Sequence, residues 1–116
     1  MLKFTVKGIP IGYKRTTQRA KYCENYKRYQ QYKDLVVLAF LEQCAGDWGA
    51  NKPLTTVKGQ KTRVDIKIYF RDFTHGDPDN VLKAILDSLF VNDKYCSASF
   101  DYFYDHANPR VEVQIS

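Results

Sequence analysis

The stretch VDIKIYFRDFTHGDPDNVLKAILDSLF (residues 64–90) contains the clearest strand pattern and the clearest helix pattern of the chain. In residues 64–70, apolar side chains alternate with polar ones, which is typical of a strand with one buried face. In residues 78–90, apolar side chains recur at intervals of three and four and form one stripe of a helix. Pro78 suits the first helical position, and Asp77 before it suits the N-cap. The stretch therefore predicts a strand, a short loop and an amphipathic helix.

The segments on either side extend this pattern. Apolar periodicity predicts three further strands, at residues 2–6, 97–105 and 110–116. It also predicts one further helix, at residues 22–44. The last two strands read as antiparallel and are joined by the short sequence HANP, residues 106–109. The predicted order is β-α-β-α-β-β, and no linker or repeat divides the chain. We therefore expect an α+β fold in one domain, residues 1–116, with a single sheet covered by two helices.

The composition favours a folded protein inside the cell. The chain has 116 residues, of which 44% are hydrophobic, enough to bury a modest core. No apolar run approaches the roughly 20 residues that span a membrane, and residues 1–6 lack the apolar core of a signal peptide. Cys23, Cys44 and Cys96 are odd in number and widely spaced, which favours reduced thiols over disulfides or a zinc site. We therefore expect a cytoplasmic protein without a membrane partner.

The charges are unevenly distributed along the chain, although the net charge is only +5. Residues 1–35 carry nine Lys and Arg against two acidic residues, whereas residues 72–105 carry seven Asp against two Lys. Solvated surfaces can show such a division by accident. The alternative is a basic surface that holds a polyanion and a separate acidic cluster that acts on it.

The acidic residues at the predicted helix start allow two interpretations. In the structural one, Asp77 caps the helix, while Asp79 favours the helix dipole and pairs with Lys83. However, capping needs one carboxylate, and here two are placed two residues apart. Two such charges about 4 Å apart would repel by roughly 4 kcal/mol at an effective dielectric near 20, and a divalent cation removes this repulsion. Hard oxygen ligands favour magnesium or manganese over zinc.

Two separated motifs together resemble one known family. The motif DPDNVLK (residues 77–83), followed by VNDK (residues 91–94), resembles the RusA-type Holliday-junction endonucleases. In that family an Asp-x-Asp-Asn-x-x-Lys helix start precedes a further aspartate in a short turn. The segment GIPIGYKR (residues 8–15) is similar to the family's N-terminal loop, in which Gly-x-Pro leads into a basic cluster. Two departures are RTT (residues 15–17) in place of Arg-Pro-Arg, and Asn92 where an acidic residue often stands.

The resemblance implies a magnesium-dependent endonuclease, with manganese as the alternative metal, that resolves branched DNA (four-way junctions) by phosphodiester hydrolysis. It implies that Asp77, Asp79 and Asp93 bind the metal and that Lys83 lies beside the scissile phosphate. Asn80 and His75 are candidate accessory residues; a helix cap and a solvated loop residue are the respective alternatives. The leading candidates for DNA phosphate contacts, ahead of Lys27 and Arg28, are Lys14, Arg15, Arg19 and Lys21.

Two features bear on assembly. A helix from Asp79 to residue 90 is about 16 Å long and separates Asp79 from Asp93, unless the helix is short or bent, the chain doubles back, or a second subunit supplies one of them. A four-way junction has approximate two-fold symmetry, which favours a homodimer. Its expected interface lies in residues 98–104 or 22–32, which are rich in aromatics. The alternatives are a less selective or flap-cutting nuclease and a non-catalytic nucleic-acid-binding module.

Overall fold

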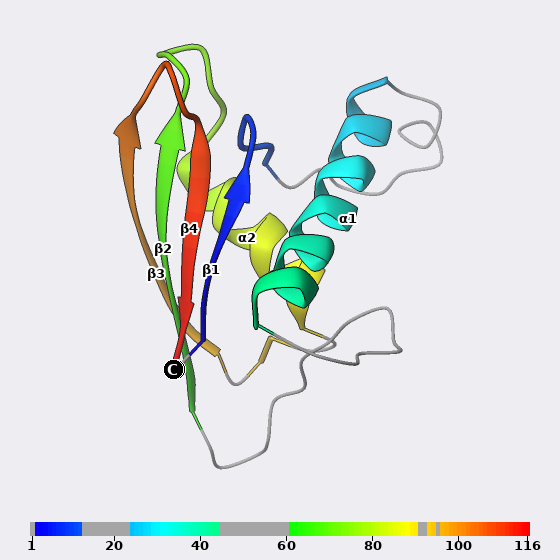
Figure 1. The fold of residues 1–116 in the computed structure, drawn as a ribbon, viewed down its shortest axis with the longest axis vertical. Coiled ribbons are helices and arrows are strands. Elements are labelled where there is room, and N and C mark those ends of the chain that lie inside the picture. Colours follow the sequence, from blue (N-terminus) through cyan, green and yellow to red (C-terminus); the bar gives the residue numbers. More distant parts are fainter. Residues whose placement is uncertain (1, 13–23, 45–60, 91–92, 95) are drawn as a thin grey trace.

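The computed structural model of the protein describes residues 2–12, 24–44, 61–90, 93–94 and 96–116. Its element order confirms the expected β-α-β-α-β-β arrangement of one small α+β domain. The elements are β1 (Leu2–Lys7), α1 (Glu24–Cys44), β2 (Thr62–Phe70), α2 (Pro78–Leu89), β3 (Cys96–Tyr104) and β4 (Arg110–Ile115). Figure 1 shows the four strands as one layer, with α2 packed against it and α1 beside β1.

The sheet has the strand order β1-β4-β2-β3 and is mixed. β4 pairs antiparallel with both β1 and β2, whereas β2 and β3 are parallel, so that β2, α2 and β3 form a crossover unit. β3 and β4 run in opposite directions, but β2 lies between them. The two strands are therefore antiparallel, as expected, but they are not neighbours, and the short connection between them does not form a hairpin. A hydrogen bond from the Asp105 amide to the carbonyl of Phe70, 2.8 Å long, instead ties the start of this connection to the end of β2.

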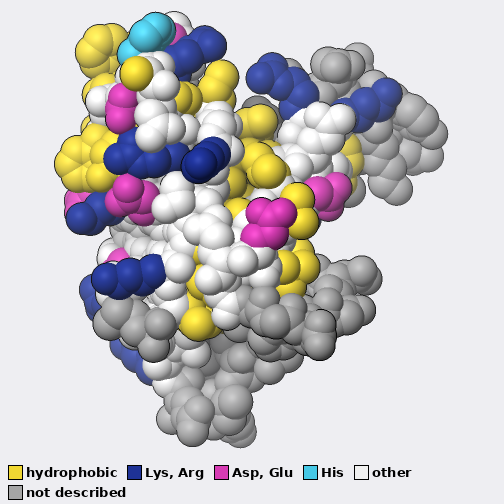
Figure 2. Space-filling model, viewed as in Figure 1, with side chains coloured by type: hydrophobic (Ala, Val, Ile, Leu, Met, Phe, Trp, Pro, Cys, Tyr) yellow, Lys and Arg dark blue, Asp and Glu magenta, His cyan; other side chains and the backbone are white. Residues whose placement is uncertain are grey.

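One hydrophobic core joins the helices to one face of the sheet. The alternating residues of β2 are buried as predicted, and their neighbours on β1 and β4 share the same face. From α1, Val36 and Phe40 enter this core, and from α2, Ile85 and Leu89 do so; all four are fully buried. The sheet's other face carries charged and polar side chains, and Figure 2 shows basic and acidic groups mixed over the strands.

The long helix α1 is fixed to the rest of the fold near its C-terminus and again in its N-terminal half. Near its C-terminus, the side-chain amide of Gln43 accepts from the Thr5 amide (3.0 Å) and donates to the Thr5 carbonyl (2.8 Å). Because these backbone groups of Thr5 point away from β4, α1 covers this edge of the sheet. In the N-terminal half of α1, the Tyr29 hydroxyl donates to Asp87 of α2, and Lys33 forms an ion pair with the same carboxylate at 2.6 Å.

The aromatic stripe expected on residues 22–32 is divided between core and surface. Tyr29 is only 1% exposed and its hydroxyl donates to Asp87, so this residue belongs to the core. Tyr26 is half-buried beside it, and Tyr22 lies outside the described residues. Neither helix in the described part of the chain is long and apolar enough to cross a membrane.

Candidate active site

The loop between β2 and α2 is shaped by Asp72. Its carboxylate accepts hydrogen bonds from the backbone amide (2.9 Å) and the hydroxyl of Thr74, and lies 3.3 Å from Nε of Arg71. The Thr74 hydroxyl contributes most to holding the pKa of Asp72 below its usual value. Asp72 therefore stays ionised at neutral pH and forms a tight turn just before the acidic residues of α2.

The acidic residues Asp77 and Asp79 lie together at the start of α2. Asp77 is the N-cap: its Oδ1 accepts a hydrogen bond from the Asp79 amide at 3.0 Å, and Pro78 occupies the first turn, as the sequence predicted. Oδ2 of Asp79 lies 3.5 Å from Nζ of Lys83, one turn along the helix. The side chains of Asp79 and Lys83 are 49% and 58% exposed, so both can reach a ligand from solvent.

A cleft of about 250 Å³ opens beside these residues. It lies between the N-terminal segment at residues 9–12, the loop after β2 and the first turn of α2. The Gly-x-Pro segment and the acidic motif, far apart in the sequence, therefore form one site. Its polar lining includes Arg28, Arg71, Thr74, Asp77 and Asn80.

Two arginines line the cleft together with the acidic residues, and one of them, Arg71, pairs with Asp72 at 3.3 Å. Arg28 projects from α1 and Arg71 follows the last residue of β2, and both are exposed. A planar guanidinium binds phosphate oxygens well, so these arginines suit a nucleic-acid backbone. The sequence placed Arg28 behind the loop cations and gave no signal for Arg71, because only the folded chain brings α1 to the end of β2.

Gly12 allows the close approach of the N-terminal segment to α2. A Cβ added at Gly12 would lie 2.9 Å from Cβ of Asn80, closer than such atoms normally approach. Asn80 itself donates its backbone amide to the carbonyl of Asp77 at 3.0 Å, and its side chain lines the cleft. The cleft wall formed by residues 9–12 can therefore pack this closely on α2 only with glycine at position 12.

This contact gives a first prediction. Gly12→Ala should lower the free energy of unfolding by about 1–3 kcal/mol, the usual cost of forcing extra volume into a packed contact. Gly76→Ala is the matched control, since a Cβ there meets nothing within 4 Å, and it should change stability by less than about 0.5 kcal/mol. Urea unfolding of both variants measures the difference, and equal stabilities would show that the segment does not pack on α2.

His75 lines the same cleft as Asp77, and both of its ring nitrogens are engaged by neighbours. Its ring stacks on Phe70, with centroids 3.7 Å apart and planes 4° from parallel. Nδ1 lies 2.7 Å from the Gly76 carbonyl, which can only accept, so this nitrogen carries a proton. Nε2 lies 2.9 Å from the Tyr104 hydroxyl, which leaves neither ring nitrogen available for a metal. His75 thus connects the site's loop to the end of β3.

Asp93 lies beyond the opposite end of α2. The helix runs unbroken for 12 residues, about 18 Å at 1.5 Å per residue. The Asp93 carbonyl accepts a hydrogen bond from the Cys96 amide at 3.0 Å, at the first residue of β3. Within the described ranges, no three His, Cys, Asp or Glu side chains converge as a metal site. One chain therefore brings together Asp77, Asp79 and Lys83, but it does not bring Asp93 to them.

The chemistry of the acidic pair fits a hard divalent cation. One oxygen of each carboxylate is engaged, by the Asp79 amide and by Lys83 respectively, and the second has no hydrogen-bond partner among the described residues. Magnesium in proteins often binds one or two carboxylates, keeps several waters and completes its shell with substrate phosphates. An exposed carboxylate pair beside a cleft that contains two arginines meets these requirements.

A larger hollow of about 530 Å³ lies over the uncovered face of the sheet. Two of its three carboxylates are neutralised locally: Asp65 pairs with Arg63 and accepts from the Ser99 hydroxyl, and Glu112 pairs with Arg110 at 3.0 Å. Mixed and compensated charges offer little to a metal or a polyanion. The smaller cleft at α2 is therefore the better candidate site.

Four of the predicted DNA contacts, Lys14, Arg15, Arg19 and Lys21, lie outside the described residues. Gly12, just before this segment, lines the cleft, and so does Arg28 of α1, which follows the segment.

Comparison with models of known protein families finds no match for the chain, and a search of curated protein sequences finds none either. The function is therefore inferred from the residues and geometry of the site itself.

Proposed function

We propose that the protein is a magnesium-dependent endonuclease that resolves four-way DNA junctions. The observation that carries this proposal is the cleft at the start of α2, which Asp77 and two arginines line, with the Asp79–Lys83 pair in the first two turns of the same helix. Carboxylates suit the metal, and arginines suit the phosphates. The resemblance of both sequence motifs to RusA-type enzymes supports the same reaction. Residues of the N-terminal motif and of the helix-start motif line one cleft, so these two parts of the resemblance are mutually consistent.

Each group has a distinct part in the proposed hydrolysis. A bound magnesium ion would supply a Lewis acid and a more acidic water at this position. Asp77 and Asp79 would hold the ion at the mouth of the cleft. Lys83, fixed by Asp79 at 3.5 Å, contributes a compact positive charge for the phosphate oxygens, on which negative charge grows during the reaction. Arg28 and Arg71 would position the strand through flanking phosphates.

We further propose that the protein acts as a homodimer in the cytoplasm. Resolution of a junction into two duplexes needs two cuts in opposed strands, and a two-fold dimer presents one site to each. Exposed aromatic side chains on β3 offer a surface for such a contact: Tyr102, Phe103 and Tyr104 are each more than 40% exposed. Lys14, Arg15, Arg19 and Lys21 remain the proposed contacts to the arms of the junction.

A panel of labelled substrates tests the proposed activity. A four-way junction, a flap and a linear duplex are incubated with the protein in magnesium, in manganese and in chelator. We expect junction cleavage only with metal, and little cutting of the linear duplex. Preferential cutting of the flap would indicate the less selective nuclease. Junction binding without cleavage under any condition would indicate a non-catalytic binding module, in which Asp77 only caps α2.

Arg28 gives a prediction for binding. Arg28→Ala should weaken junction binding for every sequence alike and flatten the dependence of log K on log salt by about one unit, as expected for one lost phosphate contact. Arg63→Ala is the matched control, since Arg63 pairs with Asp65 at the other end of β2. Fluorescence anisotropy at several salt concentrations measures both slopes. Identical slopes for wild type and Arg28→Ala would place Arg28 outside the DNA contact.

A further inference from the structure

Phe73 is the most exposed large hydrophobic side chain in the described part of the chain. It is 82% exposed, whereas Leu38, the next most exposed, is 51% exposed. Phe73 lies in the loop between β2 and α2, and its neighbours Asp72 and Thr74 both line the candidate cleft. Phe73 itself is not part of the cleft lining, so its ring lies outside the cleft but beside it. Its ring is therefore open to a ligand that reaches the cleft.

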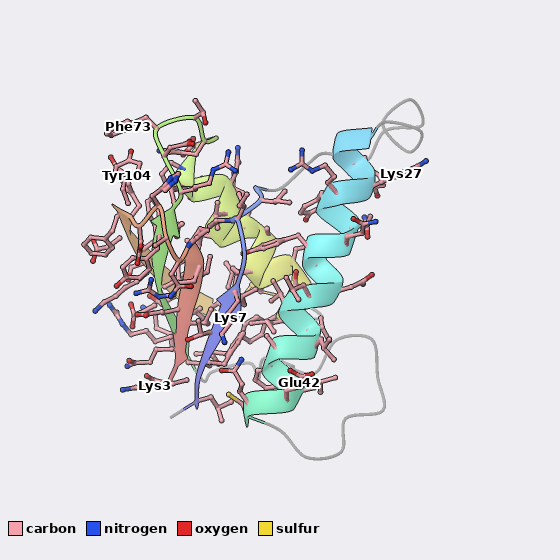
Figure 3. All side chains as sticks on the ribbon, turned by 45° about the horizontal axis from the view of Figure 1, so that its top comes forward. Lys3, Lys7, Lys27, Glu42, Phe73 and Tyr104 are labelled. Carbon is pink, nitrogen blue, oxygen red and sulfur yellow. The ribbon has the colours of Figure 1, made fainter. Side chains whose placement is uncertain are left out.

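The loop holds Phe73 in a defined position. The Asp72 carboxylate accepts hydrogen bonds from the backbone amide and the hydroxyl of Thr74, so the turn closes around Phe73. The ring contacts Tyr104 at the end of β3, with centroids 4.6 Å apart and planes at 52°. Figure 3 shows these two labelled side chains next to one another, at the end of the sheet where the candidate site lies. Because the ring is already placed, little conformational freedom is lost when a ligand stacks on it.

Tyr104, which supports Phe73, is itself anchored to the core. Its hydroxyl lies 2.9 Å from Nε2 of His75. The His75 ring stacks on Phe70, the buried last residue of β2, with centroids 3.7 Å apart. These aromatic groups form a continuous series from the core to the surface, and Phe73 is its outermost member. The series gives Phe73 a firm base beside the cleft.

The proposed phosphate contacts do not by themselves select a junction. Arg28 and Arg71 would meet phosphates that every duplex presents, so they favour DNA in general. A flat aromatic ring has a different preference, because it stacks on the face of a nucleobase. Inside a duplex, neighbouring base pairs cover these faces. In the open form of a four-way junction, each base pair at the branch point lacks a neighbour on one side. A protruding ring therefore finds a free base face at the branch point.

We propose, resting on the function proposed above, that Phe73, supported by Tyr104, stacks on a base at the branch point and so selects branched DNA. The contact is close to the proposed chemistry, because the cleft-lining residue Asp77 follows Phe73 by four residues. Arg28 and Arg71 hold the backbone of any DNA, and Phe73 determines which DNA is preferred. Phe73 is thus a specificity-determining residue and takes no part in hydrolysis.

Binding of variants to a junction and to a linear duplex, in chelator so that nothing is cut, tests this role. Phe73→Ala should bind the junction about fivefold to a hundredfold more weakly, the range expected for the loss of one stacked base. Its duplex affinity should change by less than about twofold, because the phosphate contacts remain. Phe73→Trp keeps a flat ring and should retain junction binding. Equal losses on both substrates, or no loss on either, would overturn the proposal.

Leu38→Ala is the matched control for loss of an exposed apolar side chain. Leu38 lies on α1, outside the cleft. The variant should bind junction and duplex as wild type does. A loss of junction binding as large as that of Phe73→Ala would show that exposed apolar surface in general, and not the position of Phe73, is responsible, and would overturn the proposal.

Junctions that lack a base at the branch point test whether the partner of Phe73 is a base. Abasic sites are placed in symmetry-related pairs, one pair in each junction, at every position that flanks the branch point. For one of these pairs, wild type and Phe73→Ala should bind with equal affinity, because the stacking partner is missing. A loss for Phe73→Ala that persists on every abasic junction would overturn the proposal.

Light scattering separates base stacking from a contact between protein chains. Phe73→Ala should have the mass and the circular dichroism of wild type. A lower mass would assign Phe73 to a subunit contact and overturn the proposal, as would wild-type protein that binds the duplex as tightly as the junction. None of these measurements uses cleavage. If wild type binds junctions selectively but cuts none, the proposed hydrolysis fails, and the binding comparison still decides the role of Phe73.

Discussion

Asp79→Asn should lower the rate of junction cleavage by about a hundredfold or more, the scale expected for removal of one preorganised electrostatic contact. The substitution keeps the size of the side chain and removes its charge, so the proposed metal ion would lose a charged ligand. Junction binding should be unchanged or tighter, because a negative charge near phosphate is removed as well. Single-turnover cleavage and anisotropy on the same junction measure the two effects.

A matched variant separates the site from general effects of charge. Asp34→Asn removes one negative charge from an exposed position on α1, away from the cleft, and should leave cleavage unchanged. The ion pair between Asp79 and Lys83 is solvent-exposed, so its loss should cost little stability. Full activity of the Asp79→Asn variant would contradict the assignment of Asp79 to the metal site.

The second large effect on cleavage is expected at Asp77, which has a structural role as the N-cap of α2 and a proposed role as a metal ligand. Asparagine caps helices as well as aspartate does, so Asp77→Asn should keep the hydrogen bond to the Asp79 amide and the stability of α2. Asp77→Ala should lose the cap and lower the free energy of unfolding by about 1 kcal/mol. Both should lose about a hundredfold or more in cleavage, because each removes a carboxylate that we propose as a metal ligand.

These two variants distinguish the interpretations that the sequence left open. If Asp77 only caps α2, Asp77→Asn is silent in every assay. If it also binds metal, Asp77→Asn is stable and inactive. Thermal unfolding measures the stability of each variant, and junction cleavage measures its activity, on the same preparation. A stable and fully active Asp77→Asn protein would reduce Asp77 to a structural residue.

The elements were predictable because their signals are local. Alternation in residues 64–70 and the apolar stripe of 78–90 follow directly from strand and helix geometry. The order of the strands in the sheet, in contrast, does not follow from local sequence patterns. The short connection at residues 105–109 suits a hairpin, but it can also cross one intervening strand, because strands lie only about 4.8 Å apart. Arg110, which pairs with Asp105 at 2.9 Å, helps to fix the crossing, and no periodicity reveals that contact.

The candidate site was predictable only in part. The spacing of Asp77, Asp79 and Lys83 on one helix start implied their proximity, since residues four apart share a helix face. Arg71 and the close approach of Gly12 to Asn80 depend on tertiary packing, and sequence spacing gave no sign of them. The expected length of α2 raised the separation of Asp79 from Asp93 but left several ways to overcome it, and the structure shows the helix unbroken over 12 residues.

The proposed reaction is tested most directly by mapping the cuts in a four-way junction with one label on each strand. Wild-type protein with magnesium should produce two nicks at symmetry-related positions in opposed strands, and the same protein in chelator should produce none. The products should be two duplexes. A junction that stays intact at every magnesium concentration, or that is cut equally in chelator, would contradict a metal-dependent junction endonuclease.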